Sequence, residues 1–240
     1  MDNKDFRTHL KRHLFWEALL KIRAFVTQSS VLKPALAVGA LVLVLSGLYY
    51  GQKYRISAAE SAFARATEVF HQQVGPTAPA GLEGGLRFNT EAEKFQKAKT
   101  MFDDVASRYK SLPAGPRARY YSALSLLELG QSKEAEVALR EIAALRNPDA
   151  IEPAMARLRI ADLMLREGRA AEAATYYQTL IGDEASALPR DLLLYGLAES
   201  LEAAGQKIEA RAAYLDLVNR HPQSPYAQDA RQKIDALAIL

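Results

Sequence analysis

The sequence predicts an all-α protein in which a single transmembrane helix precedes a solenoid of helix pairs. Three observations support this fold class. Residues 34–52 form an uncharged apolar run. No alternating strand pattern stands out after Ser57, and a short glycine-containing motif recurs at intervals of 38 and 37 residues. Repeats of this length indicate a stack of paired helices.

The predicted organisation has three parts. The first two are a basic cytoplasmic segment at 1–33 and a transmembrane helix at 34–52. The third is a helical repeat domain at 57–240, which we divide near 57–112, 116–150, 154–187 and 190–222, with a capping helix at 224–240.

The apolar run contains nineteen residues without a charge, from Pro34 to Gln52. As a helix it would extend over about 28 Å, close to the thickness of the hydrocarbon core of a bilayer. Tyrosines at 49, 50 and 54 would form an interfacial aromatic belt. A buried core helix and a cleaved signal peptide are the alternatives. The signal peptide fits less well because thirty-three residues precede the run.

Charge is unevenly distributed along the chain. Residues 1–55 hold nine Lys/Arg and three Asp/Glu, whereas residues 56–240 hold twenty-two and twenty-five. Positive flanks stay in the cytoplasm, which predicts a cytoplasmic N-terminus and an external repeat domain. In a Gram-negative bacterium this is a single-pass inner-membrane protein with a periplasmic domain. Residues 5–26 have apolar side chains at helical spacing and basic side chains on much of the remaining surface. This pattern is typical of a helix that lies on the inner leaflet or, alternatively, docks on a partner.

The recurring motif is a glycine followed five residues later by an alanine, and it has a physical interpretation. Each glycine would end the first helix of a pair in a left-handed turn, and each small residue would let two helices approach closely. Bulky residues follow one turn later, at Leu139, Tyr177 and Tyr214. The repeat-defining positions are Ala123, Gly130, Ala135, Ala161, Gly168, Ala173, Ala198, Gly205, Ala210 and Pro222.

A fourth, divergent pair precedes these three. We expect its helices at 57–73 and 90–111, joined by a glycine-rich loop at 75–89. Thr90 and Glu93 have the spacing of a capping box at the start of the second helix. Because no proline separates 34–52 from 57–73, we also expect a nearly continuous helix there.

The sequence contains no pattern typical of catalysis. It has no cysteine, no phosphate-binding loop and no nucleophile elbow. His9 and His13 lie four residues apart, but no further ligand completes a metal site. We therefore expect no enzyme activity, cofactor, metal or small-molecule substrate. The repeat region also lacks the basic, aromatic stripe of a nucleic-acid groove.

These small, glycine and aromatic positions resemble the tetratricopeptide repeat family over about residues 115–240. The usual tryptophan of the first helix is absent, and the period exceeds the usual 34 residues. The resemblance implies a concave groove, lined by the first helix of each pair, that binds other proteins. The implied groove residues are Arg117, Tyr120, Leu124, Leu158, Asp162, Arg166, Tyr195, Glu199 and Glu202.

The layout also resembles a narrower group, the ancillary subunits of the bacterial SecYEG translocon. Ala92-Glu-Lys-Phe and the stretch from Tyr121 to Leu129 are similar to that group. The resemblance implies that translocon subunits and periplasmic chaperones are the protein partners. The lipid bilayer is the other expected partner. Ser224-Pro-Tyr-Ala is instead similar to repeat proteins of envelope assembly and cell division. A scaffold of envelope assembly, cell division or cytochrome maturation, and a transmembrane regulator acting through 1–33, therefore stay open.

Overall fold

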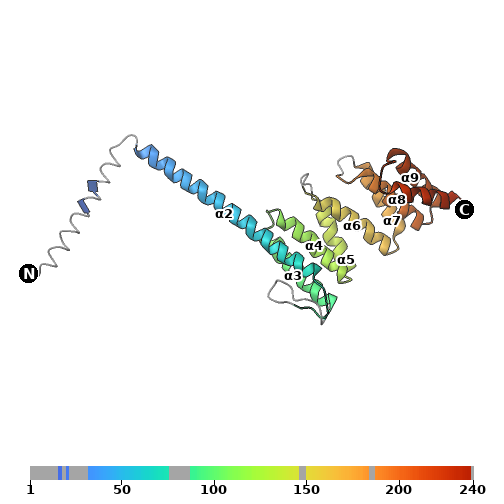
Figure 1. Ribbon diagram of the computed structural model, residues 1–240, viewed down its shortest axis with the longest axis horizontal. Coiled ribbons are helices and arrows are strands. Elements are labelled where there is room, and N and C mark those ends of the chain that lie inside the picture. The colour runs from blue at the N-terminus through green and yellow to red at the C-terminus, as the bar shows by residue number, and fades with distance from the viewer. Residues whose placement is uncertain are drawn as a thin grey trace, which may run out of the picture. The chain divides into compact units, whose positions relative to one another are not determined.

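The computed structural model describes residues 16–17, 20–21, 32–75, 87–145, 150–183 and 187–238 (Figure 1). Two units are compact by themselves, residues 1–58 and 59–240. The helices are α2 (Leu32–His71), α3 (Glu91–Arg108), α4 (Ala114–Glu128), α5 (Ser132–Ala143), α6 (Glu152–Arg166), α7 (Ala170–Gly182), α8 (Arg190–Ala203), α9 (Lys207–Arg220) and α10 (Ala227–Ala238).

One helix, α2, contains both the apolar run and the first predicted repeat helix. The nearly continuous helix expected from 34–52 into 57–73 is therefore present. Large apolar side chains between Leu36 and Leu48 are exposed, so within the described ranges this part of α2 packs on no protein core. By length and composition, α2 can cross a membrane. Most of the basic segment 1–33 lies outside the described residues. Of the few residues described in this segment, Trp16 and Leu20 are helical and exposed.

The repeat unit is a chain of neighbouring helices. From α3 to α10 each helix packs on the next one, and α4 also contacts α6 (Figure 1). The pairs α4–α5, α6–α7 and α8–α9 are joined by tight turns, each with a glycine at positive φ: 73° at Gly130, 75° at Gly168 and 78° at Gly205. Only glycine adopts this conformation without a steric cost.

The three turns share one hydrogen-bond pattern. In the first, the Gln131 N–H donates to the Leu126 carbonyl at 2.9 Å, and the Gly130 N–H donates to Leu127 at 3.0 Å. The Arg169 N–H to Met164 bond of 2.8 Å and the Gln206 N–H to Leu201 bond of 2.9 Å repeat this arrangement. This is the Schellman motif, which satisfies the last carbonyls of the first helix and reverses the chain.

Small residues lie where the paired helices meet. Ala135, Ala173 and Ala210 are fully buried in the first turn or two of α5, α7 and α9. Ala123, Ala161 and Ala198 on the first helices are equally buried. The absence of larger side chains at these positions lets the helix axes approach closely, as in other ridge-and-groove packings.

The first pair differs in having an aromatic core. Phe63 and Phe70 of α2 contact Phe102 of α3 and Tyr121 of α4, with ring centroids 5.5–6.2 Å apart. At the start of α3, the Glu93 N–H donates to Thr90 Oγ1 at 3.1 Å, and Glu93 accepts the Asn89 N–H at 3.0 Å. The predicted Thr90–Glu93 cap therefore forms, with Glu93 reaching one residue further back than a standard capping box.

The last helix, α10, covers the end of the stack. Ala227, Ala230 and Ile234 are buried against the apolar face of α9. The helix begins at Ala227, three residues after the Ser224 expected from the sequence. Ser224 is instead held in a turn, where its hydroxyl donates to Asp191 at 2.7 Å. A solenoid needs such a covering helix because its terminal repeat would otherwise expose apolar surface.

Candidate functional site

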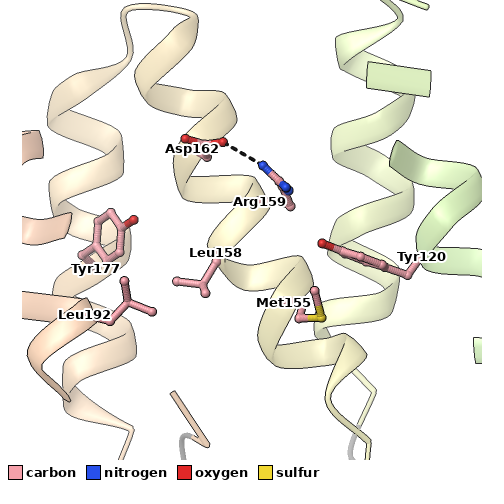
Figure 2. A pocket seen from close by; sticks show the side chains of 7 residues that line it. All are labelled: Tyr120, Met155, Leu158, Arg159, Asp162, Tyr177 and Leu192. Atoms are coloured by element: carbon pink, nitrogen blue, oxygen red, sulfur yellow. Dashed lines mark hydrogen bonds and ion pairs between the residues drawn. The ribbon is translucent and has the colours of Figure 1, made fainter. Parts of the chain in front are cut away.

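A cavity of about 280 Å³ lies among α4, α6, α7 and α8. Figure 2 shows that its lining side chains come mainly from the first helices of consecutive pairs. Three of the residues implied by the resemblance, Tyr120, Leu158 and Asp162, meet here. The full lining is Tyr120, Met155, Leu158, Arg159, Asp162, Tyr177 and Leu192.

Helix α6 supplies the centre of this cavity because of its 3.6-residue period. Leu158, Asp162 and Arg166 succeed one another at intervals of four and therefore lie along one face. Met155, one turn before Leu158, continues the same face. In Figure 2 Leu158 points toward Leu192 of α8, so an apolar wall lies between the two helices.

Charged groups border one side of the cavity. Arg159 lies 3.2 Å and Arg166 lies 3.3 Å from the Asp162 carboxylate. The side chain of Arg159 also faces the Tyr120 hydroxyl (Figure 2). Burial raises the pKa of Tyr120, and the nearby guanidinium only partly opposes this rise. Tyr120 therefore stays neutral and can donate or accept a hydrogen bond.

Tyr177 of α7 forms the back of the cavity. Its side chain is only 7% exposed, and its ring lies so close to Gly196 that a Cβ there would clash with it. Burial, together with the nearby carboxylates of Asp162 and Glu199, raises the pKa of Tyr177 to about 12. In the part of the chain that the structure describes, no hydrogen bond to its hydroxyl is found. An unpaired hydroxyl facing a cavity is a polar group that can orient a ligand.

Two other predicted groove residues on α4 lie elsewhere. Arg117 pairs with Glu60 of α2, and its guanidinium lies 4.7 Å from the centre of the Phe63 ring. This residue therefore holds the first pair onto α4 and does not line the cavity. Leu124 is half-buried against the core between α4 and α6.

The last three predicted groove residues lie together on α8. Tyr195 donates to Asp229 of α10 at 2.6 Å. Glu202 accepts the Tyr214 hydroxyl at 3.0 Å and pairs with Lys233 at 3.1 Å. Burial raises the pKa of Glu199, as do its carboxylate neighbours, whereas Tyr195 and Lys233 lower it. The three residues thus form an acidic surface, shared with α10, next to the cavity.

Four lining residues were not predicted: Met155, Arg159, Tyr177 and Leu192. Met155 and Arg159 lie within one turn of Leu158, so same-face spacing on α6 could have found them. The sequence pattern places Tyr177 in the apolar stripe of a second helix. Its ring is indeed buried, but its hydroxyl reaches the cavity because Gly196 leaves room for the ring.

Metal chemistry finds no support in the described residues. Across these ranges no cluster of three or more His, Asp or Glu side chains is placed to hold an ion. The His9 and His13 pair lies outside them.

The glycine-turned helix pairs, their nearest-neighbour packing and a side-chain cavity on the first helices define a helical-repeat domain of the protein-interaction type. A family model described as a tetratricopeptide repeat-like domain matches residues 34–239, and the chain belongs to this family. Domains of this family bind other proteins and typically serve as non-catalytic scaffolds. No curated protein matches the sequence.

Several solved structures are similar to part of this chain. Nearly identical TPR-like repeats assigned to a kinesin light chain of Podosopora anserina share 18% identity, with a TM-score of 0.48 over 60% of this chain and 78% of theirs. YrrB, a TPR protein with an unusual peptide-binding site, shares 19%, with a TM-score of 0.42 over 58% and 67%. MamA from Desulfovibrio magneticus shares 16%, with a TM-score of 0.42 over 61% and 85%.

Proposed function

We propose that this protein is a membrane-anchored adaptor whose repeat domain binds segments of partner proteins on the face formed by α4, α6 and α8. The observation that carries the proposal is the cavity between these helices, with an apolar wall and an unpaired Tyr177 hydroxyl. Ligand sites in proteins combine such apolar walls with a few polar groups that fix orientation.

The anchor in this proposal is the 34–52 part of α2. Its side chains are apolar and exposed, and in lipid they would lose contact with water. Its backbone groups are satisfied within the helix, as a membrane segment requires. The excess of Lys and Arg before it favours a cytoplasmic N-terminus, with the repeat domain in the bacterial periplasm.

Newly exported proteins and their chaperones are the partners that we propose first. A domain tethered to the inner membrane meets such chains as they leave the translocon. Extended segments with apolar side chains also match the cavity in chemistry. The second function is a scaffold for envelope assembly or cell division, favoured by the Ser224-Pro-Tyr-Ala turn that precedes α10.

Site-specific photo-crosslinking of the full chain in its native membrane tests this proposal. A photoreactive side chain replaces Leu158 in the cavity or, as control, Val137, an exposed apolar residue of α5 that does not line it. We expect protein adducts from position 158 only. Mass spectrometry then separates translocon subunits and chaperones from envelope components. Equal adducts at both positions, or none at 158, would contradict groove binding.

A further inference from the structure

We propose that the cavity binds an extended segment in one direction only. The segment carries an apolar side chain in the cavity, an acidic residue at the α6 side and a basic residue at the α8–α10 side. This inference rests on the proposed function, since it specifies what the groove recognises. It is drawn from the different charges on either side of Tyr177.

The apolar anchor is set by the cavity wall. Leu158 and Leu192 face one another across the opening, and Met155 extends the wall by one turn of α6 (Figure 2). Leu158 and Leu192 are half-buried and Met155 is 39% exposed, so a ligand can still cover all three. Removing this apolar surface from water favours an aliphatic or aromatic side chain.

Tyr177 supplies the polar contact inside the cavity. Its side chain is more than nine-tenths buried, and its hydroxyl has no partner in the described ranges. The hydroxyl can therefore donate to a peptide carbonyl, or accept from a peptide N–H, in the groove. The ring lies against Gly196, where a Cβ would be only 2.3 Å from it.

The α6 side of the cavity is electropositive. Two guanidiniums, those of Arg159 and Arg166, share the single carboxylate of Asp162. Each guanidinium has five N–H donors, so both keep donors free after this pairing. The exposed donors suit a carboxylate, which guanidinium groups bind with two parallel hydrogen bonds.

The α8–α10 side is electronegative. The carboxylates of Glu199, Glu202 and Asp229 lie around one ammonium, Lys233, which pairs with Glu202. Glu199 forms no ion pair within the part of the chain described, because Lys233 pairs with Glu202. A lysine or arginine of the bound segment would supply the missing counter-charge. Complementary charges at the two ends of a site determine the direction in which a segment binds more than they determine its affinity.

Fluorescence anisotropy with defined peptides tests this inference on the full chain in lipid nanodiscs. The probes are three labelled nonapeptides in a Gly/Ser background. One has a central Leu with two Asp before it and two Lys after it, the second has the charge order reversed, and the third has Ser in place of Leu. We expect one charge order to bind about tenfold more tightly than the other, and the Ser peptide to bind most weakly.

Variants separate the two parts of the inference. Tyr177→Phe removes only the hydroxyl and should weaken the favoured peptide about fivefold. The double variant Arg159→Glu/Glu199→Lys should bind the opposite charge order more tightly, a reversal that simple misfolding cannot produce. Lys207→Glu, an exposed change outside the cavity, is the control and should leave the preference unchanged.

The outcomes also distinguish this inference from the proposed function. If position 158 crosslinks partner proteins but both charge orders bind equally, or the double variant keeps the original preference, the directional inference fails and groove binding stands. If no peptide binds and position 158 yields no adduct, both fail.

Discussion

At the scale of single residues, the inter-helix glycines allow the cost of backbone strain to be measured separately from the cost of side-chain packing. Gly168 has a φ of 75°, and nothing lies within 4 Å of where a Cβ would be. Gly168→Ala should therefore lower the free energy of unfolding by about 1 kcal/mol, through left-handed strain alone. Chemical denaturation of the full chain in detergent measures this loss.

The matched control is Gly182→Ala. Gly182 is the last residue of α7, with equally open space around its Cβ position but no positive φ. Alanine there should leave stability unchanged or raise it by up to about 1 kcal/mol, because it restricts the unfolded chain and favours the helix. Equal losses at 168 and 182 would contradict the strain argument.

Glu199 provides a prediction about pH. Its pKa in the folded protein is raised by burial and by neighbouring carboxylates. A carboxyl group with a raised folded-state pKa destabilises the fold at neutral pH, and this penalty disappears as pH falls through that pKa. Glu199→Gln should therefore raise the melting temperature at pH 7, and the gain should vanish near pH 4. A gain in melting temperature that does not change with pH would come from side-chain packing and would contradict the electrostatic argument.

Residue patterns predicted the turns better than the binding surface. A glycine before a helix start reports a local backbone requirement, so Gly130 and Gly168 can be recognised without knowing their neighbours. The role of Arg117 depends on Glu60, fifty-seven positions earlier, which a helical wheel of α4 cannot show. The Tyr177 hydroxyl likewise reaches the cavity only because of Gly196 on another helix.

At the scale of elements, a network of ion pairs joins one helix pair to the next. Arg169, at the start of α7, contacts Glu136 of α5 at 2.8 Å, and Arg140 holds the same carboxylate at 2.5 Å. Burial alone would raise the pKa of Glu136, but hydrogen bonds from Arg140 and Arg169 outweigh it and lower this pKa. The carboxylate thus connects two second helices that are separated by α6.

Glu136→Gln tests this connection. A lowered folded-state pKa means that Glu136 stabilises the fold above the unfolded value of 4.5, and that this contribution is lost as pH falls through the folded value. The substitution should cost about 1–2 kcal/mol at pH 7 and little at pH 3, measured by chemical denaturation. Glu141→Gln, an exposed change on the same helix, should be near neutral at both pH values.

Element boundaries show where sequence patterns lose precision. The predicted helix at 90–111 is α3, which ends at Arg108, and α10 begins at Ala227 rather than Ser224. Helical periodicity reports the apolar face, whereas the ends depend on partners such as Asp191, which accepts the Ser224 hydroxyl. The existence and order of the helices were predictable because each second helix buries a regular stripe.

At the scale of the whole molecule, two kinds of apolar surface coexist in one chain. In the repeat unit the apolar side chains are buried between successive helices, so stability comes from nearest-neighbour interfaces. In the 34–52 part of α2 they are exposed, and Leu43 is 75% accessible. In the function proposed above, lipid covers this exposed apolar surface, on a helix long enough to cross a bilayer.

Charged substitutions in α2 test the membrane anchor. Arginine at the centre of a membrane helix costs about 3 kcal/mol relative to leucine, so Leu41→Arg/Leu45→Arg should cost about 6 kcal/mol of insertion free energy. We expect the unaltered chain to stay with the membrane after alkaline carbonate extraction and the double variant to appear in the soluble fraction. Val137→Arg/Ile208→Arg places the same charges on exposed apolar positions of α5 and α9 and should leave the chain in the membrane. Release of the unaltered chain, or retention of the α2 variant, would mean that residues 34–52 do not anchor the protein. The excess of Lys and Arg before residue 34 would then need another explanation, such as a partner surface.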